Sequence, residues 1–136
     1  KVDTSIKNLP GYIQFDYVKE ELSDLLAAAD LVISRAGSNA ICEFLALNKP
    51  NILIPLPASA SRGDQILNAA SFEKQGFSYL LPEEMVNDES LAKAVDEVYE
   101  NRETYIRAMK ATKASNAIDI IVNLCDEAVA NCKKKK

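Results

Sequence analysis

A turn of small and polar residues, 35–39 (RAGSN), follows the apolar run 31–34 and leads directly into a helical pattern. The first N–H groups of a helix have no intrahelical partner and lie at the positive end of the helix dipole. Ser38, Asn39 and Ala40 would present such groups, which suit a phosphate. Gly37 permits a tight turn and the close approach of a ligand to the backbone.

Glu43 lies six residues past Gly37, between one and two turns into the same helix. Its carboxylate could reach back towards the helix start and accept hydrogen bonds from a sugar diol. The turn is neither a P-loop nor a GxGxxG motif. On the pattern alone, a plain strand-to-helix turn with a solvated glutamate is therefore the stronger interpretation.

A second polar cluster follows the next apolar run, 51–56, around the start of another helix. It contains Arg62, Asp64, Gln65 and Asn68, of which the last two are three residues apart and share one helix face. Such a cluster suits sugar hydroxyls, but a helix cap by Asp64 with solvated neighbours fits equally well. Two such loops at the carboxyl ends of adjacent strands are stronger support for a ligand site than either loop is alone.

Composition excludes several classes of function. The chain has no histidine, so Ser-His and Cys-His catalysis and the usual zinc sites are excluded within it, and we expect no metal and no cofactor. The net charge of −4 argues against nucleic-acid binding. Three scattered cysteines suit a reducing cytoplasm. No apolar run approaches the ~20 residues that a membrane span needs.

The elements that would position these loops alternate between strand and helix. Apolar and β-branched runs predict strands over 12–18, 31–34, 51–56 and 77–81. Helical spacing predicts helices over 19–29, 38–47, 65–75, about 87–101, 102–112 and 116–131. This order predicts an α/β fold, a Rossmann-like parallel sheet of about four strands flanked by helices. We expect one partial domain over 1–132, followed by a solubilising lysine tail over 133–136.

The stretch "YVKEELSDLLAAADLVISRAGSNAICEFLALNKPNILIPL…GDQILNAASFEKQG" resembles the donor-binding domain of the MurG family, over roughly 12–122. This family consists of UDP-N-acetylglucosamine transferases that convert lipid I into lipid II in bacterial peptidoglycan synthesis. The resemblance implies a two-domain glycosyltransferase B-type architecture with the nucleotide sugar bound mainly by the C-terminal domain. It also implies an inverting enzyme at the cytoplasmic face of the plasma membrane, with peripheral membrane contact at most.

The resemblance further implies which residues of this sequence bind UDP-N-acetylglucosamine. Carried over by motif position, they are Val18, Lys19 and Leu22 at the uracil, Gly37, Ser38 and Asn39 at the diphosphate, Glu43 at the ribose, Asp64 and Gln65 at the N-acetylglucosamine, and the motif residues Arg35 and Asn68. Asp64 stands where the family often has glutamine, and the loop before it lacks a common histidine. We assign no catalytic residue, because the base would belong to the acceptor domain.

The acceptor domain and the first part of the donor domain would precede Lys1, so the chain is expected to be a fragment, inactive on its own. In the strand order of this fold, absent strands would lie between those at 12–18 and 31–34. The strand at 31–34 would then have an unpaired apolar edge. We expect it either to pair with 12–18 or to associate with a second copy, giving a homodimer.

Two alternatives stay open. The chain could be a non-catalytic, self-associating half-Rossmann module. It could also be the donor domain of another UDP-sugar enzyme, such as an epimerase or a diacylglycerol glycosyltransferase.

Overall fold

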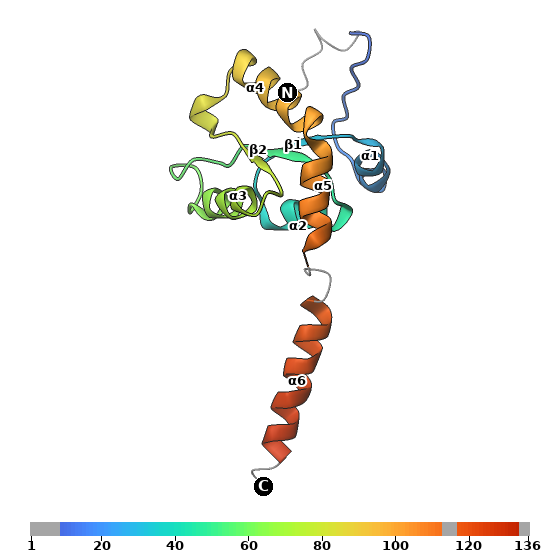
Figure 1. The fold of residues 1–136 in the computed structure, drawn as a ribbon, viewed down its shortest axis with the longest axis vertical. Coiled ribbons are helices and arrows are strands. Elements are labelled where there is room, and N and C mark those ends of the chain that lie inside the picture. The colour runs from blue at the N-terminus through green and yellow to red at the C-terminus, as the bar shows by residue number, and fades with distance from the viewer. Residues whose placement is uncertain (1–8, 113–116, 134–136) are drawn as a thin grey trace.

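The computed structural model describes residues 9–112 and 117–133, in which strands and helices alternate around one parallel sheet (Figure 1). The elements are α1 (Leu22–Ala28), β1 (Val32–Ser34), α2 (Ser38–Leu47), β2 (Asn51–Leu53), α3 (Asp64–Lys74), β3 (Tyr79–Leu80), the 3-10 helix η1 (Glu83–Met85), α4 (Asp88–Glu100), α5 (Arg102–Ala111) and α6 (Ala117–Lys133). The predicted α/β class with a parallel sheet flanked by helices is confirmed.

The sheet has the order β1-β2-β3, with all neighbours parallel. Ile33 pairs with Ile52, and Ile52 pairs with Tyr79. The central strand β2 is buried along its whole length. Because the strands are parallel, their carboxyl ends meet at one edge of the sheet, and the loops that leave them are neighbours there.

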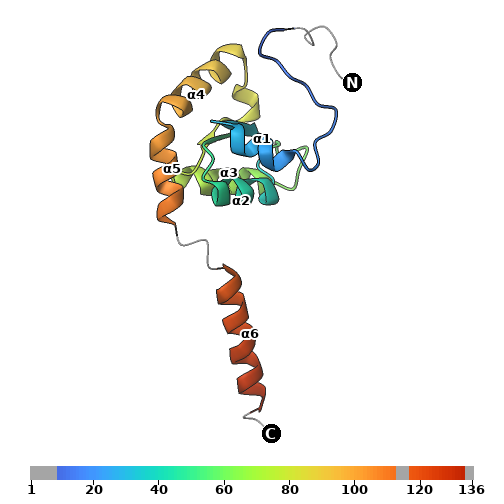
Figure 2. The same ribbon diagram turned by 90° about the vertical axis from the view of Figure 1, so that its right-hand side faces the viewer.

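Two hydrophobic clusters cover the two faces of the sheet, and adjacent residues of β2 belong to different clusters. Leu53 packs with Ile41 and Phe44 of α2 and with Ala69 of α3, whereas Ile52 packs against α4. Both residues are fully buried. This division follows from the alternation of side chains along a strand. Figure 2 shows α2 and α3 along one side of the sheet and α4 on the other.

The number of strands was overestimated, since the described residues form three rather than about four. The predicted strand at 12–18 is not a strand, and pairing of this segment with β1 does not occur. A strand is stabilised by hydrogen bonds to a neighbouring strand. Segment 12–18 has no neighbouring strand in the described part of the chain. Its apolar side chains Ile13 and Tyr17 are 77% and 76% exposed.

The apolar strand β1 is only partly buried. Ile33 in β1 is 44% exposed, because β1 is the edge strand of the described sheet. A groove of about 410 Å³ lies beside it. The groove is lined by Ile33 from β1 and by Asp88, Leu91, Ala92, Val95 and Asp96 from α4.

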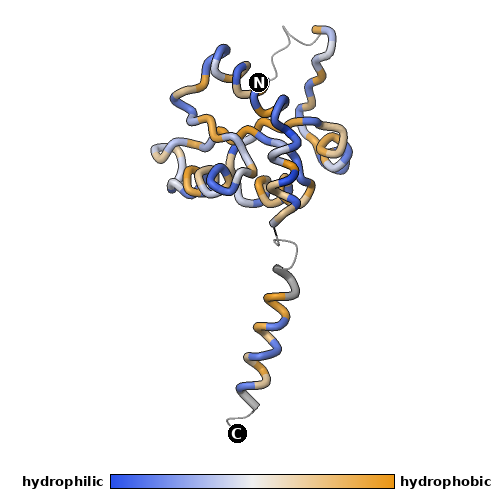
Figure 3. The backbone as a smooth tube through the Cα atoms, in the orientation of Figure 1, coloured by the Kyte–Doolittle hydropathy of each residue, from blue (hydrophilic) through white to orange (hydrophobic). Residues whose placement is uncertain are grey.

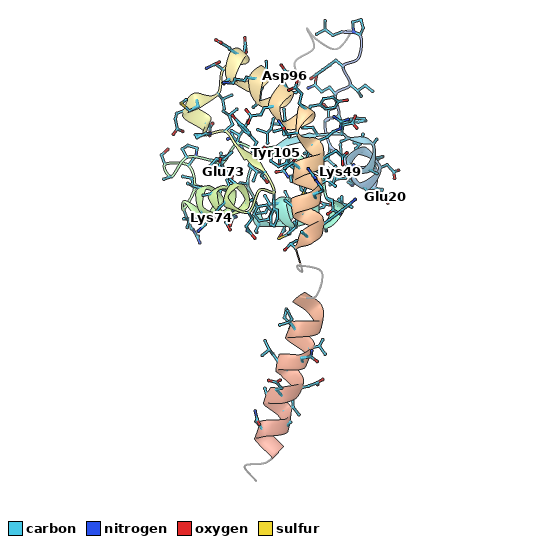
Figure 4. All side chains as sticks on the ribbon, viewed as in Figure 1. Glu20, Lys49, Glu73, Lys74, Asp96 and Tyr105 are labelled. Atoms are coloured by element: carbon cyan, nitrogen blue, oxygen red, sulfur yellow. The ribbon has the colours of Figure 1, made fainter. Side chains whose placement is uncertain are left out.

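Local capping interactions fix where several helices begin and end. Asn87 starts α4 with a reciprocal capping box, in which its side chain accepts from the Ser90 amide at 2.9 Å. Gly76 follows α3 with a φ of +73°, as expected for a residue just past a helix end. Lys49, labelled in Figure 4, donates from Nζ to the carbonyl oxygens of Ala27 and Ala29, at 2.9 and 2.8 Å, and so holds the end of α1.

Helix α6 has exposed side chains throughout residues 120–131. Figure 3 shows hydrophobic and hydrophilic residues alternating along it. None of the helices in the described ranges is both long and apolar enough to cross a membrane. Of the predicted lysine tail, 134–136 lie outside the described residues.

Asn51 should be important for stability, because its buried side chain joins two loops at the amino end of the sheet. Its Nδ2 donates to the carbonyl oxygens of Lys49 and Phe77, at 2.9 and 3.3 Å. Replacing Asn51 by alanine leaves both acceptors without this donor and should lower the free energy of unfolding by about 1–3 kcal/mol. Urea unfolding would measure the loss. Asn123→Ala on exposed α6 is the control, and equal stability of the two variants would contradict the assignment.

Candidate functional site

Three loops meet at the carboxyl edge of the sheet. Residues 35–37 follow β1, residues 54–63 follow β2, and residues 81–83 lead from β3 into η1. This edge holds most of the predicted site residues, because α2 and α3 both begin there. The parallel register of β1, β2 and β3 therefore brings together three loops that are well separated in sequence.

The start of α2 lacks a side-chain cap. Gly37 is the N-cap residue and has no side chain to accept a hydrogen bond, and the first helical bond runs from the Ile41 amide to the Gly37 carbonyl at 3.1 Å. Ser38 and Asn39 are both exposed. The first N–H groups of this ten-residue helix thus point out of its positive end, in an arrangement that can bind an anion.

Gln65 and Asn68 tie α3 to the two neighbouring loops. Asn68 donates from Nδ2 to the carbonyl oxygen of Ala36 at 3.1 Å, one residue before the N-cap of α2. Gln65 accepts from the Leu56 amide at 3.1 Å through Oε1. The Gln65 amide group keeps its NH₂ donors for another partner. Both residues lie on the α3 face that the sequence predicted, and each also has a structural contact that the sequence did not reveal.

Asp64 does not cap α3. The N-cap residue is Gly63, whose φ of +86° suits glycine and disfavours other residues. Asp64 is the first helical residue, with an exposed side chain, as is Arg62 just before the cap. The simple interpretation of Asp64 as a helix cap is therefore wrong, and its carboxylate lies in the first turn of α3 beside Gln65.

Glu43 projects from the first half of α2 as an exposed carboxylate. It shares this helix with the diphosphate turn predicted at Gly37, Ser38 and Asn39, but its side chain lies more than one helical turn further along. An exposed carboxylate can only accept hydrogen bonds, which matches the hydroxyl groups of a sugar.

The predicted uracil-binding group lies at the start of α1. Val18 is half-buried, Leu22 is 42% exposed, and Lys19 stacks its Nζ over the Tyr17 ring at 5.8 Å. The Lys19 amide donates to Glu21 Oε2 at 3.3 Å. These contacts are local, so this group is positioned by α1 and its flanking turn rather than by the loops at the carboxyl edge.

Arg35 makes a contact that sequence reasoning did not find. Its guanidinium forms a bidentate ion pair with Glu83, with distances of 2.9 and 3.2 Å, and also donates to the carbonyl oxygen of Ile54 at 3.1 Å. No local pattern links residues 48 positions apart, so only the fold could identify it.

No group of three or more metal-ligating side chains occurs within 9–112 and 117–133. The groups present at the carboxyl edge are backbone N–H donors, side-chain amides, carboxylates and the guanidinium groups of Arg35 and Arg62. This set can bind a phosphorylated sugar through hydrogen bonds and charge.

A family model for the glycosyltransferase family 28 C-terminal domain matches residues 1–124. The chain belongs to this family. Several relatives match most of the chain, and they share one name: UDP-N-acetylglucosamine–N-acetylmuramyl-(pentapeptide) pyrophosphoryl-undecaprenol N-acetylglucosamine transferase. The predicted resemblance to the MurG family is thereby confirmed.

Three of these relatives illustrate the match. The protein of Lachnoclostridium phytofermentans is 58% identical over 93% of the chain, and that of Clostridium novyi is 52% identical over 93%. The protein of Lachnospira eligens is 53% identical over 91% of the chain. The chain spans only 35–36% of the length of these relatives.

Asn68→Ala tests whether the tie between α3 and the α2 turn is structural. It removes the donor to the Ala36 carbonyl, which lies in a fully buried residue, and should lower the free energy of unfolding by about 1–2 kcal/mol. Urea unfolding of the variant beside Ser71→Ala, an exposed site on the same helix, would measure this. A loss no larger than that of Ser71→Ala would show that the contact is dispensable for stability.

Proposed function

We propose that the chain is the donor-binding portion of a transferase that moves N-acetylglucosamine from UDP to lipid I, forming lipid II in peptidoglycan synthesis. The single observation that carries the proposal is the uncapped start of α2, with exposed Glu43 on the same helix, at the carboxyl edge of the sheet. Relatives at 52–58% identity, whose printed name is that of such a transferase, support it.

Each group at this edge has a role that matches part of the donor. The amides at Gly37, Ser38 and Asn39 bind the diphosphate, and Glu43 accepts hydrogen bonds from the ribose hydroxyls. Asp64 and Gln65 contact the N-acetylglucosamine, while Asn68 and Arg35 hold the neighbouring loops through the carbonyl oxygens of Ala36 and Ile54. Val18, Lys19 and Leu22 hold the uracil.

This domain contributes to the reaction by positioning the donor and by stabilising charge. As the bond between the anomeric carbon and the diphosphate breaks, negative charge grows on the leaving diphosphate. Fixed amides and a helix dipole stabilise that charge without having to reorganise. The general base and the acceptor site belong to the rest of the enzyme, so the chain alone is expected to be inactive.

The place of action follows from the substrates. The printed name of the relatives specifies an undecaprenol-linked acceptor, which is a membrane lipid. We propose that the full-length protein acts at the cytoplasmic face of the bacterial plasma membrane and contacts it peripherally. Residues 1–132 form its partial nucleotide-sugar domain, and 133–136 form a solubilising tail.

Titration of the chain with UDP-N-acetylglucosamine, UDP-glucose and UDP tests the proposed donor. We expect the tightest binding for UDP-N-acetylglucosamine. Glu43→Ala should weaken binding of all three about 10- to 100-fold, because a hydrogen bond to a charged group contributes about 1.5–3 kcal/mol. Isothermal titration calorimetry would give the dissociation constants. Glu100→Ala, which removes an exposed carboxylate at the far end of α4, is the matched control.

The same titration separates the alternatives. Preference for UDP-glucose would support another UDP-sugar enzyme. A chain that binds none of the three ligands would contradict the donor-binding proposal and leave the self-associating module.

A second candidate function, self-association through β1, rests on a specific observation. β1 is the edge strand of the described sheet, and Ile33 is 44% exposed beside the apolar groove against α4. An open edge offers unpaired N–H and C=O groups to another strand. We propose that two copies pair through β1 and cover Ile33.

Sedimentation velocity tests this second candidate. The unaltered chain should sediment as a dimer, and Ile33→Lys should raise the dimer dissociation constant at least about tenfold, because a charge would be buried at the contact. Leu47→Lys is the control, since Leu47 is equally exposed at 44% but lies on α2. A monodisperse monomer whose amides at 31–34 exchange freely would contradict the proposal.

A further inference from the structure

Arg35 joins the ends of all three strands. It follows directly from β1, and its Nη1 donates to the carbonyl oxygen of Ile54, which comes just after β2. The same guanidinium pairs with both oxygens of Glu83 in η1, the element that follows β3. One side chain therefore connects the loops that leave β1, β2 and β3.

The Arg35–Glu83 pair is partly exposed, with side-chain exposures of 47% and 39%. Exposed ion pairs contribute little to global stability. A bidentate arginine–carboxylate pair is nevertheless geometrically specific, and a third hydrogen bond, to the Ile54 carbonyl oxygen, further restrains the guanidinium. The effect of this pair is thus local: it fixes the position of the backbone at Arg35.

That backbone leads directly into the turn at the start of α2. Arg35 is two residues before the N-cap Gly37, and the residue between them, Ala36, is held by Asn68 at 3.1 Å. The turn is therefore fixed from two sides, by Glu83 through Arg35 and by α3 through Asn68. Of these anchors, only Glu83 lies in an element with no other predicted link to the site.

We propose that Glu83 is a positioning residue for the phosphate-binding turn, acting through Arg35; this inference rests on the proposed function. Glu83 holds the guanidinium along the sheet edge and so sets the direction in which the α2 amides point. It does not contact the ligand. Arg35 therefore supports the phosphate-binding turn from the sheet edge.

The sign of the effect separates this role from simple electrostatics. Removing a carboxylate near an anion site would, by charge alone, strengthen binding of an anionic ligand. Loss of positioning weakens it instead. Glu83→Ala should therefore raise the UDP dissociation constant roughly tenfold and leave that of uridine, which has no phosphate, unchanged.

The experiment measures the affinities of UDP and uridine by NMR titration for the 136-residue chain and its variants. Glu84→Ala is the matched control, because it removes the same charge from the next residue of η1 and should not weaken UDP binding. Glu83→Gln keeps an acceptor for the guanidinium and should retain part of the affinity. In an Arg35→Ala background, Glu83→Ala should cause no further loss of UDP affinity. Urea unfolding should show all of these single variants near the stability of the unaltered chain.

The outcomes are distinguishable. If the unaltered chain binds UDP and Glu83→Ala binds it equally well or more tightly, the positioning role is overturned while the proposed function stands. The role is also overturned if UDP and uridine lose affinity in parallel, or if Glu84→Ala has the same effect. If the unaltered chain does not bind UDP, the proposed function fails and the inference fails with it.

Discussion

The parallel pairing of three very short strands is the constraint on which the rest of this domain depends. β2 has a neighbour on each side, and both pairings are in parallel register. Because side chains alternate along a strand, Ile52 enters the cluster under α4 and Leu53 enters the cluster over α2 and α3. A slip of one residue would exchange them and place each against the wrong layer. The same register brings the loops after all three strands to one edge.

Polar side chains at that edge hold the loops in place before any ligand is bound. Asn68 reaches the α2 turn, Gln65 reaches the loop after β2, and Arg35 spans the ends of the strands. A loop that is already ordered costs less free energy to fix when a ligand binds. The side-chain amide of Gln65 accepts one hydrogen bond from the Leu56 backbone and still has two N–H donors available. Structural and binding roles are therefore compatible in the same residue.

Patterns within one element could be predicted well, and patterns that need a distant partner could not. The helix at 38–47 was predicted at its observed bounds, because apolar spacing and the proline after it are local signals. The strand at 12–18 was predicted from composition that is typical of strands, but the described chain offers it no neighbour. The exposure of Ile33 has the same cause, since burial of an edge residue depends on what packs beside it.

The sequence by itself determined the order of strands and helices, the small-residue turn before α2 and the polar start of α3. It also contained the family motif that assigns the chain to the glycosyltransferase family 28 C-terminal domain. Only the tertiary structure decided that Glu83 lies against Arg35, that Asn68 holds Ala36, and that Gly63 rather than Asp64 caps α3. The physical reason is that periodicity and capping act over a few residues. A hydrogen bond between residues 32 or 48 positions apart depends on how the whole sheet brings their loops together.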